Sequence, residues 1–91
     1  MAMEEKFIAA WEQNRIAAEK LGVRMRPLDL QGAKRVLSGS RLSDGFNALA
    51  AKNALKFSLE ALAVDKRFTA LFTDEEANEA LMRLLEAGYK F

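Results

Sequence analysis

The sequence contains no cysteine and no histidine. Without cysteine, disulfides, thiolate zinc sites and thiol nucleophiles are excluded. Without histidine, the commonest general base and the commonest transition-metal ligand are missing. The remaining acid–base groups are mainly carboxylates and lysines, and none of them forms a recognisable catalytic pair. We therefore expect no catalytic residues, no metal and no cofactor, and we expect that the protein is not an enzyme.

Two stretches carry residue types found in ligand sites but lack the spacing that such sites need. The acidic run that begins at Asp74 lacks the Asp-x-Asp-x-Asp-Gly loop that surrounds calcium, whereas acids in a first helical turn complement the helix dipole. The segment SGSRLS, residues 38–43, lacks the Gly-x-x-x-x-Gly-Lys-Ser/Thr spacing of a nucleotide-binding loop. The simpler interpretation is a capped helix in the first case and a helix connection in the second.

Long apolar runs are also missing. No segment approaches the roughly 20 apolar residues that a membrane-spanning helix requires. The first residues, MAMEE, are acidic where a secretory signal peptide would be basic. We therefore expect a cytoplasmic protein that makes no contact with a membrane.

The composition is that of a globular protein, with 51% hydrophobic and 30% charged residues in a chain of 91. At this length, one domain over residues 1–91 is the simplest expectation. No alternating strand pattern occurs, whereas signals for helix starts and ends recur along the chain. The predicted fold is all-α, a compact bundle of four to five helices.

Capping residues and glycines divide the chain into the predicted helices. Gly22 suits the end of the first helix, and Asp29 and Ser43 are predicted N-caps of the second and third. Thr73 and Glu76 have the spacing of a capping box for the last helix. The predicted helices cover residues 4–21, 30–38, 44–64 and 73–87, with a further short turn at residues 66–72.

The predicted helix at residues 44–64 is apolar on two sides. Phe46 and Phe57 lie on one side, and Leu55 and Leu59 point nearly the opposite way. A narrow strip is left for water: Lys52, Asn53, Lys56 and Glu60. A helix that is apolar on two sides is buried from two sides, so we expect it at the centre, between the first and last helices. The alternative is that a second copy of the chain covers one side.

In the last helix, one conventional apolar stripe is predicted to face the core: Ala77, Ala80, Leu81, Leu84 and Leu85. Several apolar residues elsewhere have no place in a predicted stripe: Ile16, Met25, Met82, Tyr89 and Phe91. Together they would form a patch of the kind that marks an interface, and methionine suits such surfaces because it repacks easily. The leading prediction is a non-catalytic protein-interaction or regulatory module, which binds another protein or itself as a homodimer.

The charge is unevenly distributed along the chain, although the net charge is only +1. Residues 23–59 carry seven basic and two acidic side chains, whereas both flanking segments are net negative. Exposed arginine and lysine side chains can bind phosphate without reading base sequence. The alternative prediction is therefore a nucleic-acid-associated protein that uses the basic segment 24–56, with these candidate phosphate contacts: Arg24, Arg26, Lys34, Arg35 and Arg41.

Overall fold

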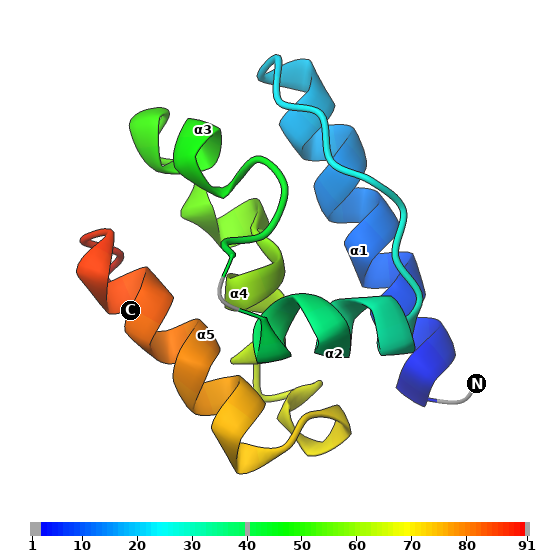
Figure 1. The fold of residues 1–91 in the computed structure, drawn as a ribbon. Helices are drawn as coiled ribbons and strands as arrows, with labels where there is room; N and C mark the ends of the chain where they lie inside the picture. The colour runs from blue at the N-terminus through cyan, green and yellow to red at the C-terminus, as the bar shows by residue number, and fades with distance from the viewer. Residues whose placement is uncertain (1–2, 40, 91) are drawn as a thin grey trace.

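Helices make up all the regular secondary structure in the part of the chain that the structure describes, residues 3–39 and 41–90 of a computed structural model. The α-helices are α1 (Met3–Lys20), α2 (Leu30–Ser38), α3 (Phe46–Ala51), α4 (Leu59–Ala63) and α5 (Asp74–Glu86). Two short 3₁₀ turns, η1 (Leu55–Phe57) and η2 (Thr69–Leu71), connect them. In Figure 1, α1 and α5 lie on opposite sides of the bundle, α4 lies between them, α3 lies at the upper left above the end of α5, and α2 crosses in front. The predicted all-α class and helix number are confirmed.

Helix ends that depend on local hydrogen bonds lie where the sequence predicts them. The Asp29 carboxylate accepts a hydrogen bond from the Gly32 N–H at the start of α2. Thr73 and Glu76 form both halves of the capping box that opens α5. At the end of α1, Gly22 adopts φ +84°, and the Val23 N–H reaches back to the Ala18 carbonyl at 3.0 Å. This backward bond belongs to the Schellman motif, which satisfies carbonyls left free at a helix end.

The prediction of one continuous helix at residues 44–64 is wrong. A Schellman motif ends α3, with Asn53 at φ 55° and the Ala54 N–H bonded to the Leu49 carbonyl at 2.8 Å. Asparagine tolerates this left-handed conformation better than most residues. The hydroxyl of Ser58 then caps α4 by accepting a hydrogen bond from the Ala61 N–H at 3.1 Å. Ser43 does not cap α3, whose N-cap residue is Gly45.

The segment is nevertheless central, as expected. Helix α4 contacts α1 on one side and α5 on the other, and Leu55 and Leu59 are both buried within the single chain. No second copy is needed to cover them. The predicted wet strip is wrong at Glu60, which is fully buried. The break before Ser58 changes the helical phase, so positions that would share one face of a continuous helix do not do so here.

Aromatic side chains fasten residues 66–72 to α1. Phe7 of α1 is fully buried and makes edge-to-face contacts with Phe68 and Phe72, at centroid distances of 5.6 and 5.5 Å. Asp65 accepts hydrogen bonds from the Arg67 N–H and guanidinium, which organises the predicted turn. Such aromatic pairs stabilise a fold by about 0.5–1.5 kcal/mol beyond their buried area. This turn therefore packs as part of the hydrophobic core.

Candidate functional site

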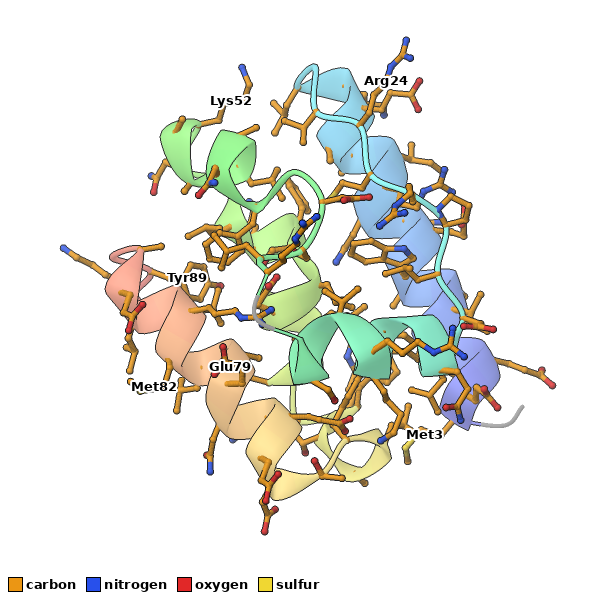
Figure 2. All side chains as sticks on the ribbon, in the orientation of Figure 1. Met3, Arg24, Lys52, Glu79, Met82 and Tyr89 are labelled. Carbon is orange, nitrogen blue, oxygen red and sulfur yellow. The ribbon has the colours of Figure 1, made fainter. Side chains whose placement is uncertain are left out.

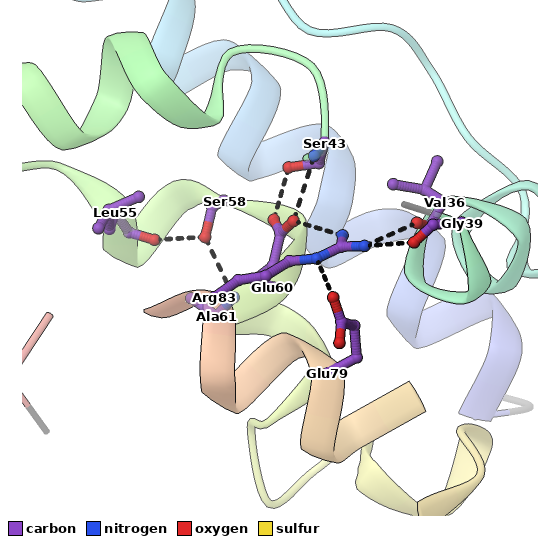
Figure 3. Close-up of polar contacts among 9 residues, drawn as sticks. All are labelled: Val36, Gly39, Ser43, Leu55, Ser58, Glu60, Ala61, Glu79 and Arg83. Carbon is purple, nitrogen blue, oxygen red and sulfur yellow. Dashed lines mark hydrogen bonds and ion pairs between the residues drawn. The ribbon is translucent and has the colours of Figure 1, made fainter. Parts of the chain in front are cut away.

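A buried ion pair joins α4 to α5 beneath the loop that follows α2. The Glu60 carboxylate is fully buried and accepts hydrogen bonds from the Arg83 guanidinium at 3.1 Å and the Ser43 hydroxyl at 2.5 Å. Arg83 also donates to the carbonyls of Gly39 and Val36, at 2.8 and 3.4 Å. Figure 3 shows these contacts converging on Arg83 and Glu60. The network thus holds Gly39 through its carbonyl and Ser43 through its N–H and hydroxyl.

Above this network lies a surface hollow of about 410 Å³, which we call the arginine hollow. Its charged lining consists of Arg26, Arg35, Arg41 and Asp44. The rest of the lining is Leu28, Val36, Leu42, Gly39 and Ser43. The walls thus come from the connection before α2, the outer side of α2 and the loop that the Glu60–Arg83 pair supports.

The Arg26 wall of the hollow is fastened to α1. The Trp11 ring N–H donates to the Arg26 carbonyl at 3.0 Å, and the Arg15 guanidinium donates to the Met25 carbonyl at 2.9 Å. Met25 itself is only 6% exposed and packs in the core. These contacts hold the backbone of the connection, while the Arg26 side chain lies exposed to solvent.

The hollow carries an excess of positive charge. Arg26 pairs with Asp44 at its rim, and both side chains are exposed to solvent. Arg35 and Arg41 are also exposed, and neither guanidinium has an ion-pair or hydrogen-bond partner among residues 3–39 and 41–90. Guanidinium groups bind carboxylate and phosphate oxygens through paired N–H donors. The hollow can therefore accept an anionic group.

Apolar side chains lie beside these arginines. Leu42 is 40% exposed, and Leu28 and Val36 are half-buried in the same lining. A ligand that carried only charge would leave this apolar surface in water. A ligand that combined an anionic group with an apolar side chain would use both parts of the lining, because removing apolar surface from water is favourable by about 25 cal/mol per Å² before the costs of association are subtracted.

The structure brings together three of the five basic residues that the sequence suggested for phosphate contacts. Arg24 lies elsewhere, at the far end of α1 (Figure 2), beside Arg15 and Glu19. The interpretation of Lys34 as a free phosphate contact is wrong. Its ammonium group donates to the Glu76 carboxylate at 2.8 Å and to the Leu71 carbonyl at 3.0 Å, so this lysine joins α2 to α5.

The environment of Glu76 shifts its acidity. Burial raises the pKa of the Glu76 carboxyl, but hydrogen bonds from Lys34, the Thr73 N–H and Ser38, together with the Lys34 charge, more than offset that effect. The pKa of Glu76 therefore lies below its usual value. The carboxylate is held in its charged form as a structural partner of Lys34.

The apolar residues proposed as one partner-binding patch do not form one. Ile16 is 49% exposed on α1, whereas Met82 projects away from the bundle on α5, on the opposite side (Figure 2). Met25 is buried, so its assignment to an exposed patch is wrong. Tyr89 is half-buried against the core, because its N–H closes the Schellman motif at the end of α5. Phe91 lies outside the described residues.

Leu42 and Leu85 are exposed leucines that the sequence pattern does not identify as surface residues. Leu85 was predicted to face the core but is 53% exposed, the same fraction as Met82 three residues earlier. Leu42 lies in a segment whose sequence predicts only a connection between helices. The helical wheel places Leu85 nearer to Met82 than to Leu84, which is the signal that could have identified it.

Residues 3–39 and 41–90 contain no group of three or more acidic side chains arranged to hold a metal ion. In the same residues, no helix combines the length and apolar character needed to cross a membrane. Comparisons with protein-family models, with curated proteins and with solved structures each found no match. The arginine hollow is therefore the feature on which a functional proposal is best based.

Proposed function

We propose that this protein is a non-catalytic interaction module that binds an acidic, partly apolar segment of a protein partner in the arginine hollow. One observation carries the proposal: Arg35 and Arg41, without partners among the described residues, converge with Arg26 beside exposed apolar surface. Ligand sites commonly combine apolar walls with a few polar groups that fix orientation. This lining matches that description.

The hollow favours a protein segment over nucleic acid. Backbone recognition of nucleic acid uses basic side chains spread along a face or groove, and single-strand binding adds aromatic platforms. Here Arg24 and Lys34 lie away from the hollow, and the lining contains aliphatic side chains and no aromatic ring. An acidic peptide with leucine-like side chains fits such a lining better than a phosphate backbone does.

Asp44 already places one carboxylate on Arg26 at the rim of the hollow. Exposed ion pairs contribute only about 0–1 kcal/mol, so a ligand carboxylate can replace Asp44 at small cost. Asp44 is then an internal competitor for the site. Substitution of Asp44 by Asn should strengthen binding of an acidic ligand, because it frees Arg26 and removes a like charge.

The test measures binding of a fluorescein-labelled synthetic helix of glutamate and leucine residues by fluorescence anisotropy. Removing both unpaired guanidinium groups in the double variant Arg35→Ala/Arg41→Ala should weaken binding at least about tenfold, since a hydrogen bond to a charged group is worth roughly 1.5–3 kcal/mol. Arg24→Ala is the matched control, because it removes an exposed arginine outside the hollow. It should change the affinity less than about twofold.

Trp11 supplies a second readout, because this single tryptophan donates a hydrogen bond to the Arg26 carbonyl. Peptide binding should change its emission in the parent protein and not in the double variant. The proposal fails if the peptide does not bind, or if Arg24→Ala weakens binding as much as the double variant does. Tight binding of duplex or single-stranded DNA instead, with a steep loss between about 50 and 300 mM salt, would favour the nucleic-acid alternative.

A further inference from the structure

The outer face of α5 exposes two large apolar side chains. Met82 and Leu85 are each 53% exposed, and their spacing of three residues places them on one side of the helix. In Figure 2, Met82 points away from the bundle. Single exposed apolar residues are common, but a contiguous pair on one helix face is an apolar surface available for a partner.

The exposed charged side chains of α5 itself are all acidic. Asp74, Glu75, Glu79 and Glu86 lie on the exposed side of α5, and Arg83, the one basic residue of this helix, is buried against Glu60. Glu75 and Glu86 have no ion-pair partner in the described part of the chain. The outer face of α5 is therefore an acidic and partly apolar helix surface.

These properties are complementary to those of the arginine hollow. The hollow presents Arg35 and Arg41 beside Leu42, and the α5 face presents Glu75 and Glu86 beside Met82 and Leu85. None of these four charged groups has an ion-pair partner among the described residues. We infer that the partner is a second copy of this chain, and that the outer face of α5 of one copy docks across the arginine hollow of the next. This inference rests on the proposed function, because it names the occupant of the same hollow.

The size of the hollow determines how the helix docks. A cube of 410 Å³ has an edge of about 7 Å, smaller than the diameter of roughly 10–12 Å of a helix with its side chains. The helix therefore lies across the mouth, with Met82 or Leu85 inserted between the arginines. Glu75 and Glu86 are about 16 Å apart along the axis, at 1.5 Å per residue, and lie on either side of the inserted residue.

In the inferred docking, the α5 face of one copy meets the hollow of the next in a head-to-tail arrangement, which is a heterologous contact. Each added copy leaves one hollow and one helix face free, and such contacts build open assemblies unless a ring closes. One helix face across one hollow makes a small interface, and small interfaces are typical of weak association. Because exposed charges contribute, association should be strongest at low ionic strength.

The test is sedimentation velocity of the full chain from about 5 to 500 μM at low ionic strength. The weight-average sedimentation coefficient should rise with concentration and not level off at the dimer value. Met82→Ser/Leu85→Ser should abolish the rise, and circular dichroism should show an unchanged helix content because both side chains are exposed. Ile16→Ser is the matched control, since it removes an exposed apolar side chain on α1 and should leave association intact.

A charge exchange tests the pairing of the two surfaces. Arg35→Glu/Arg41→Glu reverses the hollow, and Glu75→Arg/Glu86→Arg reverses the helix face. Each variant alone should stay monomeric, because its two surfaces then carry like charges. An equimolar mixture should associate again, since the acidic hollow of one variant meets the basic helix face of the other.

The outcomes separate this inference from the proposed function. A strictly monomeric parent chain that still binds the glutamate–leucine peptide would overturn self-association and leave the proposed function standing. Self-association that survives in Arg35→Ala/Arg41→Ala, or in Met82→Ser/Leu85→Ser, would overturn the inference. A plateau at the dimer value, or a charge-exchanged mixture that stays monomeric, would also overturn it.

Discussion

Individual charged residues in this protein differ mainly in whether they are buried. Glu60 and Arg83 form a pair that is almost completely removed from water, and each is held by further hydrogen bonds to Ser43 or to backbone carbonyls. Desolvation of two charges costs several kcal/mol, which only good geometry and additional hydrogen bonds offset. Asp44 and Arg26, by contrast, meet in solvent. The first pair therefore fixes the fold, and the second is available for exchange with a ligand.

Substitution of Arg83 by Met should destabilise the protein by about 3–5 kcal/mol, because it leaves the Glu60 carboxylate buried without its positive partner. The double variant Arg83→Met/Glu60→Leu should lose less than the single variant, since no buried charge is left. Urea denaturation measures both free energies of unfolding. Glu79→Gln, which removes only the exposed partner of Arg83, is the control. Equal losses in the single and double variants would contradict this account.

Because the pKa of Glu76 is lowered in the folded protein, the free energy of unfolding should decrease as the pH falls. The folded state holds this carboxyl in its charged form below the usual value of 4.5, whereas the unfolded chain protonates near that value. The stabilisation is therefore present above about pH 4.5 and is lost as pH falls further through the lowered pKa. The urea midpoint of the parent protein should fall between about pH 6 and pH 3. It should fall less in Lys34→Met, because that variant lacks the ammonium group that lowers the pKa of Glu76. The exposed control Lys52→Met should behave like the parent protein. Identical pH profiles would contradict the Lys34–Glu76 linkage.

The arrangement of the helices depends strongly on the backbone conformation of the connections between them. Gly22, Asn53 and Gly88 end α1, α3 and α5 with the same Schellman motif, and in each case the following residue turns back toward the core. Gly45 starts α3 in the left-handed region at φ +76°, packed against the connection that follows α1. Four residues with positive φ therefore determine where three helices end and how closely Gly45 approaches the connection after α1.

Substitution of Gly45 by Ala should be costly for two reasons. The left-handed conformation is unfavourable for alanine by roughly 1–2 kcal/mol, and the new Cβ would lie 2.7 Å from Val23 Cγ1. Overpacking of that kind adds about 1–3 kcal/mol. Gly88→Ala is the matched control, because Gly88 has φ +83° with nothing within 4 Å of the added Cβ. Thermal and urea denaturation should therefore show a clearly larger loss for Gly45→Ala, and equal losses would contradict the predicted clash.

For the whole molecule, the distribution of charge matters more than its sum. Residues 23–59 hold the excess of basic side chains and form the arginine hollow, whereas the exposed side of α5 is acidic. A net charge of +1 provides little long-range repulsion between copies. The two surfaces can then attract each other at short range. The whole molecule therefore has a basic surface and an acidic surface, and its hydrophobic core is complete within one chain.

The sequence by itself determined the fold class and most helix ends. Asp29, Gly22 and the Thr73–Glu76 capping box act through bonds between residues a few positions apart, so their effects can be predicted without knowledge of the fold. The break inside residues 44–64 also had local signals, in Asn53 and Ser58. The two-sided apolar pattern outweighed these signals in the prediction, because a continuous helix and a broken one can both bury it.

Tertiary structure alone decided which charged residues are free and which are structural. Glu60 meets Arg83 across 23 positions, and Lys34 meets Glu76 across 42, so neither partner is visible in the local pattern. The convergence of Arg26, Arg35 and Arg41, and the burial of Met25, likewise depend on how α1, α2 and the loop after α2 pack together. Hydrogen bonds between near neighbours specify elements, whereas burial and long-range pairing arise only when the elements pack.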